Sequence, residues 1–131
     1  MVPTPNALLL VAAGGAAGSV ARYLLAGWTL SAAPGQKFPF GTLLVNLGGC
    51  LAVGLLAGAA ERHGAWLTDE LRLLLFTGVL GGFTTFSAFG LETAQLLRRG
   101  DWLLAGGYVG ASVLLGLALV LLGLHLAGPG R

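Results

Sequence analysis

Isolated polar side chains within long apolar stretches are the residues of this sequence most able to do chemistry. They are Arg22, Asn46, Glu92, Tyr108 and Ser112, together with the segment of residues 81–90. A charged or strongly polar group inside a bilayer is costly unless it is paired or faces water, and it then often marks an ion pathway. Each of these positions is therefore a candidate site for an ion or a proton.

Asn46 and Arg22 differ in how they would treat an anion. The amide of Asn46 offers two N–H donors without a charge, which suits a small anion that must be released again. Asn46 also follows Thr42 by four residues, so both lie on one helical face, and an asparagine at this depth equally suits an interhelical hydrogen bond. Arg22 lies about sixteen residues into its apolar stretch. It either extends to lipid headgroups or lines a water-filled vestibule that concentrates anions.

Residues 81–90 have the sequence GGFTTFSAFG. Adjacent glycines, β-branched threonines and a serine disfavour a continuous helix, so this segment predicts a break. Backbone carbonyls freed by a break at membrane depth can coordinate a cation such as Na+. Phe83, Phe86 and Phe89 recur every three residues and are expected on one side. They either pack against neighbours or present their positively polarised ring edges to an anion.

Glu92, Tyr108 and Ser112 add an acid and two hydroxyls at membrane depth. Glu92 is expected to be salt-bridged, protonated, or extended toward the interface. Tyr108 and Ser112 are four residues apart and share one helical stripe, as ordinary interhelical hydrogen bonders would. Taken with the Asn46 amide and the ring edges, these hydroxyls indicate an uncharged path rich in donors.

The composition places these residues in a bilayer. Of 131 residues, 9% are charged and 56% are hydrophobic, whereas soluble domains carry about 25% charged residues. Seven basic against five acidic residues provide no surface for nucleic acid, and Cys50 has no cysteine partner within the chain. We therefore expect an all-α membrane protein with one domain, residues 1–131, and four spans at about 7–28, 40–60, 71–97 and 102–126.

Glycines recur at a spacing of four within these spans. The pairs are Gly14 and Gly18, Gly54 and Gly58, Gly78 and Gly82, and Gly106 and Gly110. Such a pair leaves a bare patch on one helical face, so we expect close contact between helices there.

The charges between the spans favour neither orientation in the membrane. With four spans, one side carries Arg62, Arg72 and Arg131, and the other carries Lys37, Arg98 and Arg99. Basic residues normally gather on the cytoplasmic side, so this balance predicts insertion both ways and an antiparallel dimer with dual topology. The alternative is one orientation set by a factor outside the count, such as Asp101 beside Arg99.

Three segments resemble the signatures of the CrcB/Fluc fluoride channels. They are GGAAGSVARY at residues 14–23, GTLLVN at residues 41–46 and GGFTTFSAF at residues 81–89, in the order of the family. The resemblance covers essentially the whole chain. It implies a fluoride-selective channel, not an enzyme, that exports toxic fluoride passively across the inner (cytoplasmic) membrane. The implied assembly is an antiparallel homodimer with two pores and a structural Na+ at its interface.

The resemblance also assigns roles by motif position. The fluoride pore takes Asn46, Phe86, Phe89, Tyr108 and Ser112, the vestibule takes Arg22, the intramembrane acid is Glu92, and the carbonyls of Gly81 and Thr84 from both chains hold Na+. Phe83 falls at a variable motif position and is not assigned to the ion. A third hydroxyl expected one turn after Ser112 is replaced by Gly116, which leaves the length of the hydroxyl track open.

Other functions fit these residues less well. A proton-coupled multidrug exporter with four spans needs a carboxylate in its first span, where this chain has Arg22. A scaffold subunit would use the glycines and Asn46 for packing alone and would pass no ions. An intramembrane hydrolase needs a serine and a histidine together, but His63 lies between spans and His125 at the end of one. A paired paralogue in place of a second identical copy stays open.

Overall fold

The computed structural model contains four apolar helical spans. It describes residues 3–130. Arg131, which the charge balance counted, lies outside the described residues. The elements are α1 (Pro5–Ala32), α2 (Phe40–Arg62), the 3-10 helix η1 (Gly64–Trp66), α3 (Asp69–Arg72), the π-helix η2 (Leu73–Leu80), α4 (Gly81–Phe83), α5 (Phe86–Arg98) and α6 (Trp102–Ala127). The third span runs from α3 to α5, and all four spans are long and apolar enough to cross a membrane. The all-α fold class is confirmed.

The ends of the helices follow from local sequence. The hydroxyl of Thr4 accepts the N–H of Ala7 at 3.2 Å, and Pro5 occupies the first helical position of α1. Thr68 caps α3 in the same way, accepting from Leu71 at 3.2 Å. Between α5 and α6 the chain turns at Gly100, whose φ of 80° suits a residue without a side chain.

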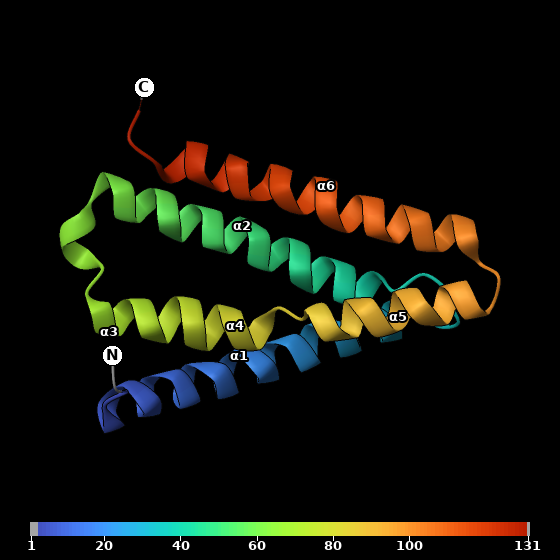
Figure 1. Cartoon of the computed structure of the whole chain (residues 1–131), viewed down its shortest axis with the longest axis horizontal. Helices are drawn as coiled ribbons and strands as arrows, with labels where there is room; N and C mark the ends of the chain where they lie inside the picture. Colours follow the sequence, from blue (N-terminus) through green and yellow to red (C-terminus); the bar gives the residue numbers. More distant parts are fainter. Residues whose placement is uncertain (1–2, 131) are drawn as a thin grey trace.

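Two pairs of helices are held together through glycine. Figure 1 shows α2 lying along α6, and α1 lying along the first half of the third span. A Cβ on Gly14 would lie 2.6 Å from the carbonyl oxygen of Leu74, and one on Gly18 would overlap the carbonyl of Val79. On the other pair, a Cβ on Gly123 would lie 2.6 Å from the nitrogen of Leu55. Backbones this close require glycine.

Three of the four glycine pairs expected from their spacing lie at contacts between helices. Gly14 and Gly18, Gly54 and Gly58, and Gly78 and Gly82 all lie against neighbouring backbone, as expected. Gly106 and Gly110 differ, because a Cβ on either would meet nothing within 4 Å. Their bare face is turned away from the other helices of the chain.

The third span is broken at Thr84 and Thr85, as the composition of residues 81–90 predicted. Both residues are extended, with ψ of 157° and 115°, and Figure 1 shows the thin link between α4 and α5. The expectation that Phe83 shares a side with Phe86 and Phe89 is not supported, because those two rings line a cavity whose described walls do not include Phe83. The ring of Phe83 lies against α2, 3.6 Å from a Cβ placed on Gly49. Helical periodicity does not continue through two extended residues.

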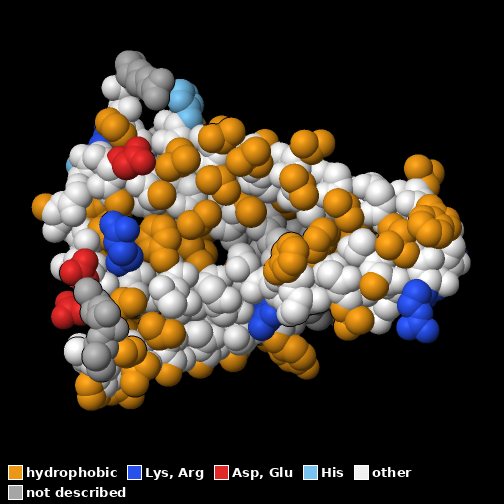
Figure 2. Space-filling view, in the orientation of Figure 1, with side chains coloured by type: hydrophobic (Ala, Val, Ile, Leu, Met, Phe, Trp, Pro, Cys, Tyr) orange, Lys and Arg blue, Asp and Glu red, His pale blue; other side chains and the backbone are white. Residues whose placement is uncertain are grey.

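Apolar side chains cover the length of the molecule. Figure 2 shows the charged side chains mostly at the two ends, with hydrophobic side chains between them. Exposed leucines occur along every span, among them Leu9, Leu55, Leu91 and Leu114. An exposed apolar surface this extensive is unfavourable in water and suits lipid tails. The chain is a multi-pass membrane protein.

Replacing Gly18 with alanine tests the packing of α1 against the third span. The new methyl group would overlap the Val79 carbonyl, and overpacking of this kind costs about 1–3 kcal/mol. We expect a lower midpoint in a thermal unfolding series in detergent. Gly15→Ala is the matched control, because its Cβ would meet nothing within 4 Å. Equal stability of the two variants would contradict the packing described.

Candidate functional site

Asn46 holds the break in the third span through both ends of its side-chain amide. Its Nδ2 donates to the carbonyl of Thr85 at 3.0 Å, and its Oδ1 accepts the N–H of Thr85 at 2.8 Å. Thr85 is extended and buried, so its backbone needs partners from within the protein. One hydrogen of Nδ2 is left for another acceptor. Asn46 is thus a structural clamp, and its role as an anion donor stays a prediction.

The same contacts free two backbone carbonyls. In a continuous helix, Gly81 would accept from the N–H of Thr85, which is donated to Asn46 instead. Thr84 would accept from the N–H of Ala88, which is donated to the hydroxyl of Thr85 at 3.2 Å. These are the two carbonyls that the family resemblance assigns to Na+. The Gly82 carbonyl between them accepts from the hydroxyl of Ser19 at 3.4 Å.

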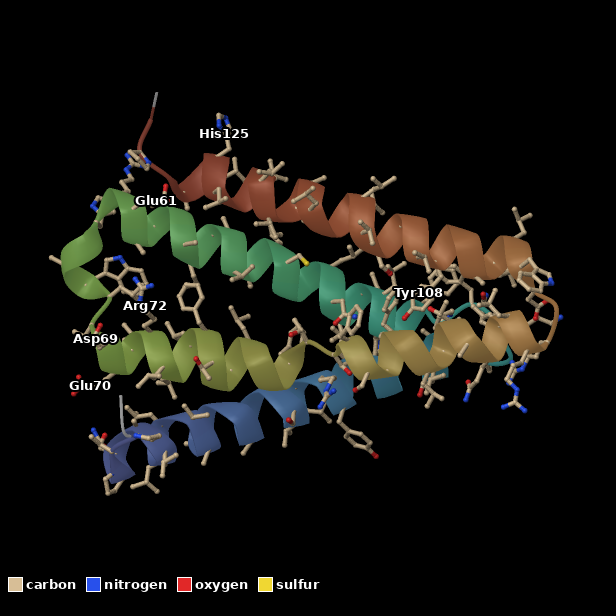
Figure 3. The ribbon with its side chains drawn as sticks, in the orientation of Figure 1. Glu61, Asp69, Glu70, Arg72, Tyr108 and His125 are labelled. Atoms are coloured by element: carbon tan, nitrogen blue, oxygen red, sulfur yellow. The ribbon has the colours of Figure 1, made fainter. Side chains whose placement is uncertain are left out.

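Glu92 on α5 accepts hydrogen bonds from two hydroxyls on two other helices. Thr42 donates to Oε1 at 2.7 Å, and Tyr108 donates to Oε2 at 2.7 Å. Tyr108 is fully buried and projects from α6 toward α5 (Figure 3). Of the states expected for Glu92, a salt bridge is not found among residues 3–130. Thr42 was not among the site residues predicted from the sequence, although it lies on the same helical face as Asn46.

Aromatic rings lead from this acid to the surface of the chain. The ring of Phe89 lies 5.1 Å from that of Tyr108 and 5.5 Å from that of Phe86. Phe86 is 83% exposed, so the row begins at the surface of the single chain. Phe38 contacts Tyr108 edge-on at 5.5 Å and was not expected there. It precedes α2 and had no periodic pattern to place it.

One cavity of about 470 Å³ gathers most of the expected site residues. Its walls include Asn46, Gly81, Thr84, Phe86, Phe89 and Ser112. Among the described residues, the hydroxyl oxygen of Ser112 is buried without a hydrogen-bond partner. Gly116 is buried beside Cys50, whose sulfur would lie 3.3 Å from an added Cβ. In this chain the hydroxyl stripe on α6 therefore stops at Ser112.

Arg22 lies apart from that cavity. It borders a separate recess of about 300 Å³ with Ser19, Tyr23, Thr42 and Thr85 among the other walls. The side chain is half-buried, and no ion pair to it is found in the described part of the chain. Thr42, Tyr108 and Glu92 together form a hydroxyl–carboxylate cluster. Because Thr42 belongs to both, the recess beside Arg22 adjoins this cluster.

Comparison with known proteins gives consistent results over most of the chain. Residues 9–124 match the family described as CrcB-like protein, Camphor Resistance (CrcB). A protein of Methylobacillus flagellatus named Fluoride-specific ion channel FluC is 50% identical over 119 residues, which cover 91% of this chain and 92% of that one. Proteins of the same name are 48% identical in Nitratidesulfovibrio vulgaris, covering 95% and 96%, and 52% identical in Rhizobium leguminosarum bv. trifolii, covering 88% and 91%.

Removing the amide of Asn46 tests the clamp. Asn46→Ala leaves the N–H and the carbonyl of Thr85 without partners, and each unmade bond of this kind costs about 1–3 kcal/mol. We expect a large loss of thermal stability in detergent. Ser31→Ala is the control, because that exposed hydroxyl bonds only within its own helix. Stability equal to the wild type in Asn46→Ala would show that other groups hold the break.

Proposed function

Since the chain belongs to the CrcB family, we propose that it is a fluoride-specific ion channel, through which fluoride leaves the cell passively across the cell membrane. The observation that carries this proposal is the cavity beside the break, where Asn46, Phe86, Phe89 and Ser112 line one space. These four come from three different spans. A channel moves its ion without converting it, so the protein is not an enzyme.

The chemistry of these four residues fits a small, strongly hydrated anion. A permeating ion must exchange its water for protein groups one at a time and must leave again. The free hydrogen of the Asn46 amide and the buried hydroxyl of Ser112 are donors without charge. The edges of Phe86 and Phe89 are weakly positive. Such groups bind fluoride weakly enough for release, and the larger chloride is excluded where the rings narrow the passage.

Glu92 regulates this path through its two hydroxyl partners. The hydroxyls of Thr42 and Tyr108 both point at the carboxylate. An anion can use either hydroxyl only when that hydroxyl turns away from Glu92. The carboxylate thus keeps two donors oriented and occupied until an ion competes for them. Arg22 supports the approach, since a cation beside a recess raises the local anion concentration, and no described residue forms an ion pair with it.

The proposal includes an antiparallel homodimer with two pores. The cavity that holds the pore residues is open to the surface of one chain, and Phe86 at its edge is 83% exposed. A second copy would close this cavity and bury the ring. The balanced charges of the connections support opposite orientations for the two copies.

A structural Na+ belongs to the same proposal. Gly81 and Thr84 each have a carbonyl that has lost its helical partner. Carbonyl oxygens suit a hard cation such as Na+. Gly81 is exposed on the single chain, so a second copy can bring its own carbonyls to the same place. The ion would join the two broken spans.

Fluoride and chloride release from liposomes tests the channel and the role of Phe86. Purified protein should release fluoride rapidly and retain chloride, with valinomycin carrying the balancing potassium. Phe86→Ile keeps an apolar side chain but removes the ring, and should lower fluoride release at least about tenfold. Phe83→Ile is the matched control from the same motif and should stay near the wild type. Wild-type release of both ions, or of neither, would contradict the proposal.

Replacing Gly81 with valine tests the interface. A Cβ at Gly81 would lie 3.6 Å from the carbonyl of Phe76, an ordinary contact that the chain tolerates. The added side chain would, however, crowd a cation held by the adjacent carbonyls of two copies. We expect the variant to elute as a monomer in detergent, while Gly27→Val, with no neighbour within 4 Å, stays dimeric. A dimeric Gly81→Val would remove the support for this interface.

A further inference from the structure

A third cavity, of about 230 Å³, lies beside the connection between α1 and α2. Two of its walls, Thr42 and Glu92, belong to the cluster described above. Others come from the α1–α2 connection, including Gln36, Lys37 and Phe38. The cavity therefore extends from the hydroxyl–carboxylate cluster to a connection at one end of the molecule, to which the proposed function assigns no role.

Lys37 and Glu92 are the two charged residues among the described walls of this cavity. Lys37 is 70% exposed, and its Nζ lies 3.8 Å from a carboxylate oxygen of Asp101. An exposed pair at this distance is weak, so the ammonium stays available to a passing anion. The remaining cations of this end, Arg98 and Arg99, border a different recess.

Asp101 is placed to act on Lys37 rather than on its own helix. It occupies the N-cap position of α6, where an aspartate usually accepts a hydrogen bond from the first turn. No such side-chain bond is made here. Asp101 is 23% exposed, so it is more confined than its partner. Its carboxylate contacts the ammonium and offsets part of its charge.

We propose that Lys37 collects anions at this entrance and that Asp101 sets how strongly it does so. The inference rests on the proposed fluoride channel. An anion that approaches the hydroxyl–carboxylate cluster meets the negative charge of the Glu92 carboxylate. A cation at the rim of the cavity raises the anion concentration before that point, and the walls of a cleft focus its field. Asp101 weakens this attraction and so limits the occupancy of the entrance.

Fluoride release by variants that each remove one charge, measured at two ionic strengths, tests the inference. Over about 10 Å of water, one unit charge changes local anion concentration about twofold. Fluoride release in about 0.01 M salt should therefore fall about twofold in Lys37→Gln and rise about twofold in Asp101→Asn. Both variants should match the wild type in about 1 M salt, where charges are screened within about 3 Å. Lys37→Arg keeps the charge and should match the wild type throughout.

The direction of the two effects distinguishes electrostatic attraction of anions by Lys37 from a purely structural contact between Lys37 and Asp101. If Lys37 and Asp101 only fasten the two connections to each other, both substitutions should lower release together, at either ionic strength. That result overturns the inference, as does release that neither substitution changes. Lys37→Glu adds a further check and should release fluoride more slowly than Lys37→Gln in low salt. Absence of fluoride release from the wild type would instead refute the proposed function.

Discussion

Two hydrogen bonds between the Asn46 amide and the backbone of Thr85 stabilise the break in the middle of the third span. An extended residue in an apolar layer is tolerated when the protein satisfies its backbone, and Asn46 satisfies both groups. The break starts a new helix, α5, at Phe86, which places the rings of Phe86 and Phe89 beside the cavity and directs Glu92 toward α6. It also frees the Gly81 and Thr84 carbonyls. One side-chain amide therefore supports both the proposed anion path and the proposed cation site.

Charge is kept away from the groups proposed to touch fluoride. The cavity with Asn46, Phe86, Phe89 and Ser112 has no charged residue among its described walls. Arg22 and Lys37 border separate recesses, and Glu92 points its oxygens at two hydroxyls. Charged groups on the approach raise the concentration of an anion, while uncharged donors in the passage let it leave. This division explains how one path can attract an ion and still conduct it.

Composition and periodicity predict much of this fold, because the lengths of apolar stretches and the glycine spacing are properties of local sequence. The break was likewise predictable from residues 81–90. The rotation of α4 relative to α5 was not, since it depends on the angles of Thr84 and Thr85, so helical periodicity could not place the ring of Phe83. The partners of Asn46 and Glu92 also lie on other spans, at separations of 39 residues for Thr85, and 50 and 16 residues for Thr42 and Tyr108. No spacing along one helix predicts such contacts.

Uncharged donors beside the break are proposed to conduct fluoride and to exclude chloride. The reversal potential across a planar bilayer containing the protein tests this selectivity, with opposed gradients of the two ions. We expect a potential that is set by the fluoride gradient alone and does not move when the chloride gradient is changed. A potential that follows chloride as closely as fluoride would contradict it.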